Sequence, residues 1–254
     1  MNSAQKRAVV YSRVPSLRTN PPWATRYPSL HLARLHRSQI EEWQSFYGDV
    51  RQATTNAIGA PPATAAQAAG PMEYYMTGNE LGVTGRFGEH VLSRLGPVIE
   101  SPVPRVVIGD VHCAENAHPI LHDLPDCVVL NIRQGHTTVG SVIELKTPWT
   151  IDLSNRRTYK FYRVLGQLAQ YMDTYSCRYG LVSTYNQSIV VRRVSNYRFA
   201  LSPVVTHRQE SSQVPVRVSL KECVLFLSLK VKGNDWRWGG PVIGRPLING
   251  TYTG

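Results

Sequence analysis

The sequence lacks long hydrophobic runs and has few cysteines. No stretch of about 18 uninterrupted apolar residues occurs among its 254 residues, so we expect no transmembrane helix. The N-terminus lacks the apolar block of a secretory signal, which predicts an intracellular protein. The 4 cysteines form no CxxC pair, and reduced thiols are the simplest interpretation. With 42% hydrophobic residues the chain can still build a core.

Acidic residues are also scarce, above all near the N-terminus. The chain has 28 Lys and Arg against 17 Asp and Glu, a net charge of +11. The first forty residues contain several arginines and no acid, so we expect a basic, Pro-containing arm. A basic arm favours a polyanionic partner, nucleic acid first. No membrane partner is expected, because the long apolar run is missing. Nucleus or cytoplasm is the expected location, and the arginine-rich start is also compatible with a mitochondrial transit peptide.

The pattern of apolar residues predicts one large domain behind that arm. Residues 1–71 are expected to comprise the arm, a short helix over 39–50 and a Pro/Ala-rich linker over 53–71. Residues 72–254 form the expected domain, with its core at about 79–195 and a C-terminal extension. The expected core elements are a helix over 79–95, strands over 103–111, 127–133 and 141–146, a helix over 156–176, and a hairpin of 179–185 with 189–194. This order predicts an α/β fold with a mixed β-sheet flanked by helices.

The helix over 156–176 has two stripes. Its apolar stripe, expected to be buried, is Phe161, Val164, Leu165, Leu168 and Met172. Its polar stripe is Arg156, Lys160, Arg163, Gln167 and Tyr171. The three basic members, Arg156, Lys160 and Arg163, are candidate contacts to a nucleic-acid backbone.

Two carboxylates and one lysine are expected at one end of the sheet. Asp126 opens the strand over 127–133, and Glu144 and Lys146 end the strand over 141–146. Side chains alternate along a strand, so Glu144 and Lys146 share a face. A tight turn at Gly135 places Asp126 opposite Glu144, whereas a longer loop through Gly140 shifts the partner by a few residues.

Such a trio suits metal-assisted hydrolysis of a phosphodiester. Two carboxylates offer oxygen ligands to Mg²⁺ or Mn²⁺, which keeps waters for the substrate phosphate. The metal acidifies a bound water and neutralises charge that develops on phosphorus. A lysine can orient the water or stabilise the transition state. The basic composition agrees with a nucleic-acid substrate, with DNA favoured over RNA.

These residues carry a resemblance to a known family. Pro125-Asp126 followed by Glu144-Leu145-Lys146 resembles the motif of the PD-(D/E)XK nuclease superfamily. The pair Gln167 and Tyr171 resembles the QxxxY motif of its RecB-like branch. The runs VIELKTPW, LGQLAQYM and YGLVSTYN are similar to uncharacterised fungal members. The resemblance covers about residues 79–195.

The resemblance implies a restriction-endonuclease-like core of αβββαβ order and a Mg²⁺- or Mn²⁺-dependent deoxyribonuclease. Asp126 and Glu144 would hold the metal, and Lys146 would act on the water or the transition state. Gln167 and Tyr171 would position the backbone or the lysine. Many members of the superfamily dimerise, so a homodimer is an implied partner.

Glu89 is the implied additional metal ligand, because the superfamily often places an acid on the helix before the sheet. Glu80 and Glu100 are its alternatives, since Gly82, Gly85 and Gly88 blur the phase of this helix.

Other functions remain as alternatives. The first is a catalytically inactive member of the same fold that binds nucleic acid or protein. Glycoside hydrolysis is disfavoured, because a lysine beside the glutamate and a basic surface suit phosphate better than sugar. Zinc is a further alternative at a run of ligand-type residues whose spacing matches no familiar finger. That run is His112, Cys113, His118, His122 and Cys127.

Overall fold

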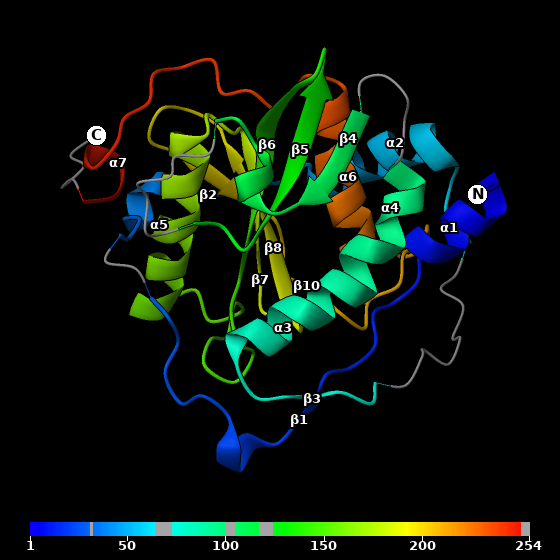
Figure 1. Ribbon diagram of the computed structural model, residues 1–254, viewed down its shortest axis with the longest axis horizontal. Coiled ribbons are helices and arrows are strands. Elements are labelled where there is room, and N and C mark those ends of the chain that lie inside the picture. The colour runs from blue at the N-terminus through cyan, green and yellow to red at the C-terminus, as the bar shows by residue number, and fades with distance from the viewer. Residues whose placement is uncertain (31–32, 64–72, 100–104, 117–123, 250–254) are drawn as a thin grey trace.

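A mixed β-sheet organises the protein. The computed structural model describes residues 1–30, 33–63, 73–99, 105–116 and 124–249. Its 8-stranded sheet has the strand order β2-β9-β8-β7-β6-β5-β4, and β10 pairs with β8 (Figure 1). The predicted α/β fold with a mixed sheet and flanking helices is therefore confirmed. Among the described residues, no helix combines the length and the apolar character needed to cross a membrane.

The strands and helices of the described residues have the following bounds. The strands are β1 (Arg18–Thr19), β2 (Ile40–Glu42), β3 (Met76–Thr77), β4 (Arg105–Gly109), β5 (Cys127–Arg133), β6 (His136–Leu145), β7 (Tyr179–Ser183), β8 (Gln187–Arg193), β9 (Phe199–Leu201) and β10 (Val205–Thr206). The helices are α1 (Ser3–Val10), α2 (Phe46–Ile58), α3 (Glu80–Phe87), α4 (Ser93–Ile99), α5 (Tyr159–Thr174), α6 (Leu220–Lys232) and α7 (Pro246–Asn249).

The centre of the sheet has the predicted order of elements. Strands β4, β5 and β6 form an antiparallel meander. Helix α5 then crosses over, and β7 pairs parallel to β6 before turning into β8. The strands predicted over 103–111, 127–133, 179–185 and 189–194 are confirmed within two residues at most ends. The strand predicted from 141 begins earlier, at His136, because Gln134 and Gly135 form a tight turn with φ of 52° and 85°.

A β-bulge at Gly140 sets the register that matters for the site. Val129 pairs with Ser141 and Leu130 with Val139, so Gly140 has no partner residue on β5. A Cβ at Gly140 would lie 2.7 Å from both methyl groups of Val231, which favours glycine there. Beyond the bulge Cys127 pairs with Ile143. One position further along the strands, Asp126 lies opposite Glu144, which is the pairing that the tight-turn alternative predicted.

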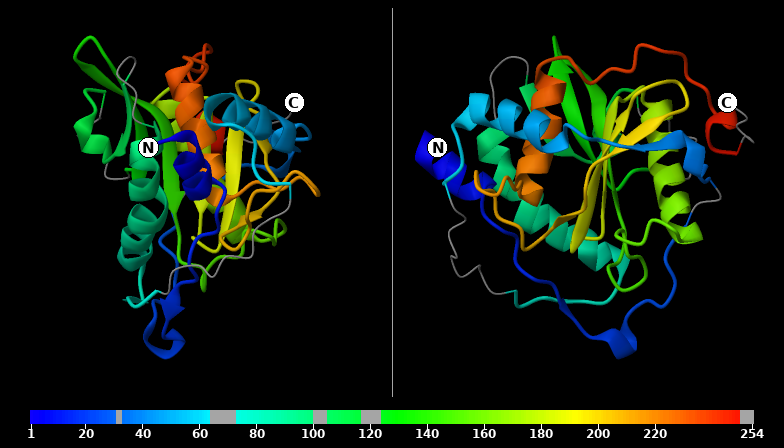
Figure 2. Two further views of the ribbon diagram at one scale, coloured as in Figure 1. Left: turned by 90° about the vertical axis from the view of Figure 1, so that its right-hand side faces the viewer. Right: turned by 180° about the vertical axis from the view of Figure 1, so that it is seen from behind.

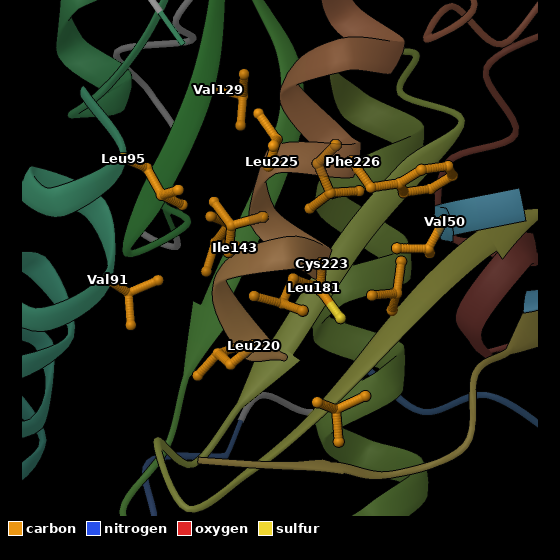
Figure 3. Close-up of a cluster of buried hydrophobic side chains, with 14 of the residues drawn as sticks. Val50, Val91, Leu95, Val129, Ile143, Leu181, Leu220, Cys223, Leu225 and Phe226 are labelled. Carbon is orange, nitrogen blue, oxygen red and sulfur yellow. The ribbon is translucent and has the colours of Figure 1, made fainter. Parts of the chain in front are cut away.

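Helix α6 buries one face of the sheet. It lies in the C-terminal extension, and its N-cap Ser219 accepts a hydrogen bond from the Glu222 N–H. Figure 3 shows its side chains between the strands and the helices α2 and α4. The labelled members are Val50, Val91, Leu95, Val129, Ile143, Leu181, Leu220, Cys223, Leu225 and Phe226. Burial of each large aliphatic side chain contributes about 1.5–3 kcal/mol, so this layer fixes α6 on the sheet.

Helix α5 covers the opposite face. Its predicted apolar stripe is buried throughout, as the 3.6-residue period requires. Thr158 caps the helix by accepting from the Phe161 N–H, so the helix begins at Tyr159. Arg156, which the sequence placed on this helix, precedes it.

The helix predicted over 79–95 is interrupted. Helix α3 ends at Phe87, a π-helical turn spans Gly88–Leu92, and α4 follows. The π-turn changes the helical phase between α3 and α4. Leu81 is 79% exposed, whereas Phe87 and Val91 are buried.

The basic N-terminal segment belongs to the folded domain and is not a free arm. Val10 and Val14 are buried against α2, α4 and α6. Strand β1 pairs with β3, and β2 is an edge strand of the main sheet. The helix predicted over 39–50 begins later, at Phe46, and continues as α2 to Ile58, inside the predicted linker. Residues 64–71 of that linker lie outside the described residues. Apolar positions spaced among the arginines carry this packing.

Candidate active site

The ends of β5 and β6 bring two acidic side chains together. Asp126 Oδ2 accepts a hydrogen bond from the Leu145 N–H at 2.7 Å. The Asp126 and Glu144 carboxyls interact electrostatically, since the charge of Asp126 raises the pKa of Glu144. Like charges on two interacting carboxyls favour retention of a proton by one of them or binding of a cation. Val142 faces α5, so strand alternation places Glu144 and Asp126 on that side as well.

Lys146 completes this group. Its Nζ lies 2.7 Å from Glu144 Oε1, and the two side chains are 1% and 2% exposed. The Lys146 N–H donates to the Ser183 carbonyl at 2.9 Å, which continues the parallel ladder of β6 and β7 past Leu145. The predicted convergence of Asp126, Glu144 and Lys146 is therefore present.

A second acidic residue contacts the lysine from α3. Glu80 Oε1 lies 3.4 Å from Lys146 Nζ. Ser29 bridges the two, since its Oγ donates to Glu80 Oε1 at 2.6 Å and accepts from Lys146 Nζ at 3.0 Å. Glu80 is the first residue of α3, and the Asn79 side chain caps that helix by accepting from the Gly82 N–H. The N-cap thus fixes where the Glu80 carboxylate lies.

Lys146 contacts Glu80 rather than Glu89, the acid predicted as an additional metal ligand. The Glu89 side chain is 52% exposed and forms an ion pair with Arg86. Glu89 lies in the π-turn, more than two helical turns after Glu80. The glycines prevent the sequence from fixing which acid of this helix faces the sheet. Glu80, an alternative that the sequence offered, lies beside Lys146. Glu100 lies outside the described residues.

Burial controls the protonation of the three groups. Burial raises the pKa of Glu144 to about 8, although Lys146 opposes it. Burial also raises the pKa of Asp126 to about 6, although the Leu145 N–H stabilises the charged form. Burial alone would lower the pKa of Lys146, but Glu144 and Glu80 outweigh it and raise that pKa above its usual value. At neutral pH the lysine is therefore charged, and the carboxyl pair retains one proton, mainly on Glu144.

The group has the chemistry of a cation site. Glu144 Oε2 is buried and has no hydrogen-bond partner among the described residues. A buried acceptor without a partner is costly, and a cation at this oxygen would satisfy it. No set of three or more His, Cys, Asp or Glu side chains arranged for a metal occurs in the described part of the chain. Mg²⁺ is commonly held by one or two carboxylates with waters completing its shell, so Asp126 and Glu144 fit such an ion.

The zinc alternative gains no support. Cys113 is exposed, whereas Cys127 is buried in β5. His118 and His122 lie outside the described residues.

The two residues of the predicted QxxxY motif contact each other. Gln167 Nε2 donates to Tyr171 OH at 3.0 Å, and Tyr171 is buried between α5 and the sheet. Gln167 Oε1 is buried without a hydrogen-bond partner among the described residues. Both lie on the helix that covers the face bearing Glu144. Gln167 and Tyr171 therefore lie on the same side of the sheet as Glu144.

The three basic residues proposed to contact a backbone bind groups of the protein itself. Arg156 pairs with Glu42 and donates to the Ser202 carbonyl at 2.9 Å. Lys160 donates to the Thr150 carbonyl at 3.3 Å, and Arg163 donates to the Leu30 carbonyl at 3.1 Å. These contacts fix α5 to neighbouring segments, so contact with nucleic acid would require them to exchange partners.

The N-terminal segment also crosses the site. Trp149 Nε1 donates to the Thr25 carbonyl at 2.8 Å, and the Thr25 N–H donates to the Gly78 carbonyl at 2.9 Å. On the other side, Asp126 borders a groove of about 580 Å³ between α4 and β4. Asp126 thus lines this groove, whereas Glu144 is buried and is not among the lining residues. Ser29 was not identified from the sequence, because no motif links it to the distant Lys146.

Comparison with known proteins adds no relative. No family model, no curated protein and no solved structure matches this chain. The functional interpretation therefore depends on the geometry of the site.

Proposed function

We propose that this protein is a Mg²⁺- or Mn²⁺-dependent nuclease that hydrolyses phosphodiester bonds, with DNA as the favoured substrate. The observation that carries the proposal is the convergence of Asp126, Glu144 and Lys146, with Lys146 Nζ 2.7 Å from Glu144 Oε1. The order of a helix, an antiparallel meander, a crossover helix and a parallel strand supports it, since this is the arrangement that the PD-(D/E)XK resemblance implies.

Each member of the group has a defined role in this proposal. Asp126 and Glu144 would hold the cation, Glu144 through its buried Oε2. A bound divalent ion supplies an acidified water and neutralises charge on the phosphate. Lys146 donates hydrogen bonds as a charged ammonium, which stabilises negative charge that develops on a phosphate oxygen. Glu80 holds the ammonium in place, and Ser29 occupies the contact that a phosphate oxygen would take.

Residues on α5 would assist. Gln167 and Tyr171 form a hydrogen-bonded pair that can position the substrate backbone or the lysine. Lys160 and Arg163 each donate to a backbone carbonyl, and phosphate could replace that carbonyl because it offers a charge-assisted contact.

A second candidate function has its own support. The Lys146 ammonium already contacts Glu144, Glu80 and Ser29, and it is 1% exposed. A satisfied, buried ion cluster of this kind can also be a structural remnant in a protein that only binds nucleic acid or protein. That function predicts salt-sensitive binding without cleavage.

The test is a cleavage assay on the full chain. Single- and double-stranded DNA and RNA are each incubated with Mg²⁺, Mn²⁺ or EDTA. The nuclease proposal predicts cleavage with the divalent ions, none in EDTA, and none with Glu144→Gln. Binding without cleavage of any substrate supports the second function, and cleavage that persists in EDTA contradicts the metal-dependent mechanism.

A further inference from the structure

Exposed aromatic side chains gather at one end of the molecule. Among the described residues, 11 large hydrophobic side chains are exposed, and six of them lie in residues 18–30 and 73–81. We call these two segments the aromatic lobe. Its exposed members are Trp23, Tyr27, Tyr74, Tyr75, Met76 and Leu81. Exposed apolar surface of this density is uncommon on a protein without a partner and marks an interaction site.

The lobe has an ordered backbone. Strands β1 and β3 pair in parallel, with Arg18 opposite Met76 and Thr19 opposite Thr77. Thr25 donates to the Gly78 carbonyl through both its N–H and its Oγ1, at 2.9 and 3.0 Å. In Figures 1 and 2 the two segments lie together below α3, at the end of the molecule away from α6. The rings are therefore presented from fixed positions.

The rings are aromatic and strongly exposed. Trp23 is 85% exposed, Tyr27 82% and Tyr74 75%. Aromatic faces of this kind stack on unpaired bases of any sequence, whereas a duplex keeps its base faces inside the helical stack. Two rotatable bonds per ring keep the loss of side-chain entropy on binding small.

The charge of the lobe complements a nucleic-acid backbone. Arg18 and Arg26 are exposed, and no carboxylate of the described chain pairs with either. The lobe's own acids are engaged elsewhere, Glu73 with Arg86 and His90, and Glu80 with Lys146. Arginines interleaved with aromatic rings combine phosphate contacts with base stacking.

The lobe is continuous with the candidate active site. Ser29 and Glu80 both belong to it, and both contact Lys146 Nζ. We propose that the aromatic lobe binds the unpaired bases of a single-stranded nucleic acid and places its backbone beside Lys146. This inference deepens the proposed function, because it names single strands as the substrate class.

The test is a binding measurement that needs no cleavage. Fluorescence anisotropy in EDTA compares the full chain on a labelled oligothymidine strand and on a blunt duplex of equal length. Trp23→Ala and Tyr27→Ala should each weaken single-strand binding about 5- to 100-fold and duplex binding less than about 2-fold. Trp23→Phe and Tyr27→Phe keep an aromatic face and should retain affinity. Val242→Ala, at a residue 59% exposed outside the lobe, is the matched control.

The arginines provide a second readout. Arg26→Ala should reduce the slope of log affinity against log salt by about 0.7, since one phosphate contact to a single strand is lost. Tyr27→Ala should leave that slope unchanged, because stacking releases no counterions. An equal slope in wild type and Arg26→Ala contradicts the backbone contact.

Two results overturn the inference. One is single-strand affinity that both alanine variants leave unchanged. The other is self-association of the wild-type chain through the lobe. In that case light scattering would show a monomer for Trp23→Ala, while its single-strand affinity would equal that of wild type. Both are distinguishable from failure of the nuclease proposal, because ring-dependent binding in EDTA is scored without any cleavage.

Discussion

The Nζ of Lys146 donates a hydrogen bond to the Oγ of Ser29 at 3.0 Å, although 117 residues separate them in the sequence. The same ammonium lies 2.7 Å from Glu144 Oε1 and 3.4 Å from Glu80 Oε1. Three segments of the chain, which carry Ser29, Glu80 and Glu144, thus meet at the Lys146 ammonium. The N-terminal segment is part of this site, and its removal should disturb the charged cluster as well as the stability.

Ser29→Ala should lower the free energy of unfolding by about 1–2 kcal/mol. The hydroxyl bonds one charged donor and one charged acceptor, and such hydrogen bonds contribute more than neutral ones. Chemical denaturation followed by tryptophan fluorescence measures the change. Ser195→Ala, at an exposed serine, is the control and should change stability by less than about 0.5 kcal/mol. Equal effects of the two substitutions would show that the Ser29 contacts do not stabilise the fold.

The metal-free protein should lose stability between about pH 5 and pH 8 through its carboxyl pair. The folded-state pKa values of Asp126 and Glu144 are raised to about 6 and about 8, above those of the unfolded chain. Their stabilising contribution is therefore complete at low pH and is lost as pH rises through the folded values. Glu144→Gln cannot release this proton, so its melting temperature relative to wild type should increase steadily over this range in EDTA. A difference that is constant with pH contradicts the raised pKa of Glu144.

Binding of a divalent ion should release a proton. Near pH 7 the carboxyl pair holds one proton, mainly on Glu144, which the ion must displace. Mn²⁺ affinity should therefore increase with pH, by up to about tenfold per unit between pH 6 and 8. Calorimetry at pH 7 in two buffers of different ionisation enthalpy measures the number of protons released, which we expect to be near one. Binding without proton release would place the ion elsewhere.

Gly166→Ala should loosen the N-terminal segment from α5. A Cβ at this position would overlap the main chain of Ala33 and Arg34, so that segment or the helix must move. We expect a loss of about 1–3 kcal/mol in unfolding free energy and faster proteolysis of the N-terminal segment. The control is Gly85→Ala in α3, where a Cβ meets nothing within 4 Å. That change should be neutral or stabilise by up to about 1 kcal/mol. A stable Gly166→Ala protein with unchanged proteolysis would contradict this packing.

The core of the fold could be predicted from the sequence because its signals are local. The apolar period of α5 and the alternation around Val128 and Val142 are visible within short windows. The pairing of Asp126 with Glu144 was predicted from a tight turn at Gly135, but it also needs the bulge at Gly140, which shifts the register by one residue. The N-terminal segment was misjudged because its charge obscured buried residues such as Val10.

The long-range part of the site could not be predicted in the same way. No local pattern places Ser29 against Lys146, since the contact depends on how the N-terminal segment passes α5 and α3. The choice between Glu80 and Glu89 depends on the N-cap at Asn79 and the π-turn after Phe87, and glycines leave both open in the sequence. The partners of Arg156 and Arg163 likewise come from segments distant in the chain.

The most direct test of the central claim is the single-turnover rate of DNA cleavage with Mn²⁺ for wild type, Lys146→Ala and Lys230→Ala. Lys230 lies on α6, outside the site, and its Nζ is 2.8 Å from Asp235 Oδ2. Its replacement therefore controls for the loss of a paired lysine. The account predicts a rate at least about 100-fold lower for Lys146→Ala and a rate within about 2-fold of wild type for Lys230→Ala, with both variants folded by circular dichroism. Wild-type cleavage by folded Lys146→Ala would contradict the proposed mechanism.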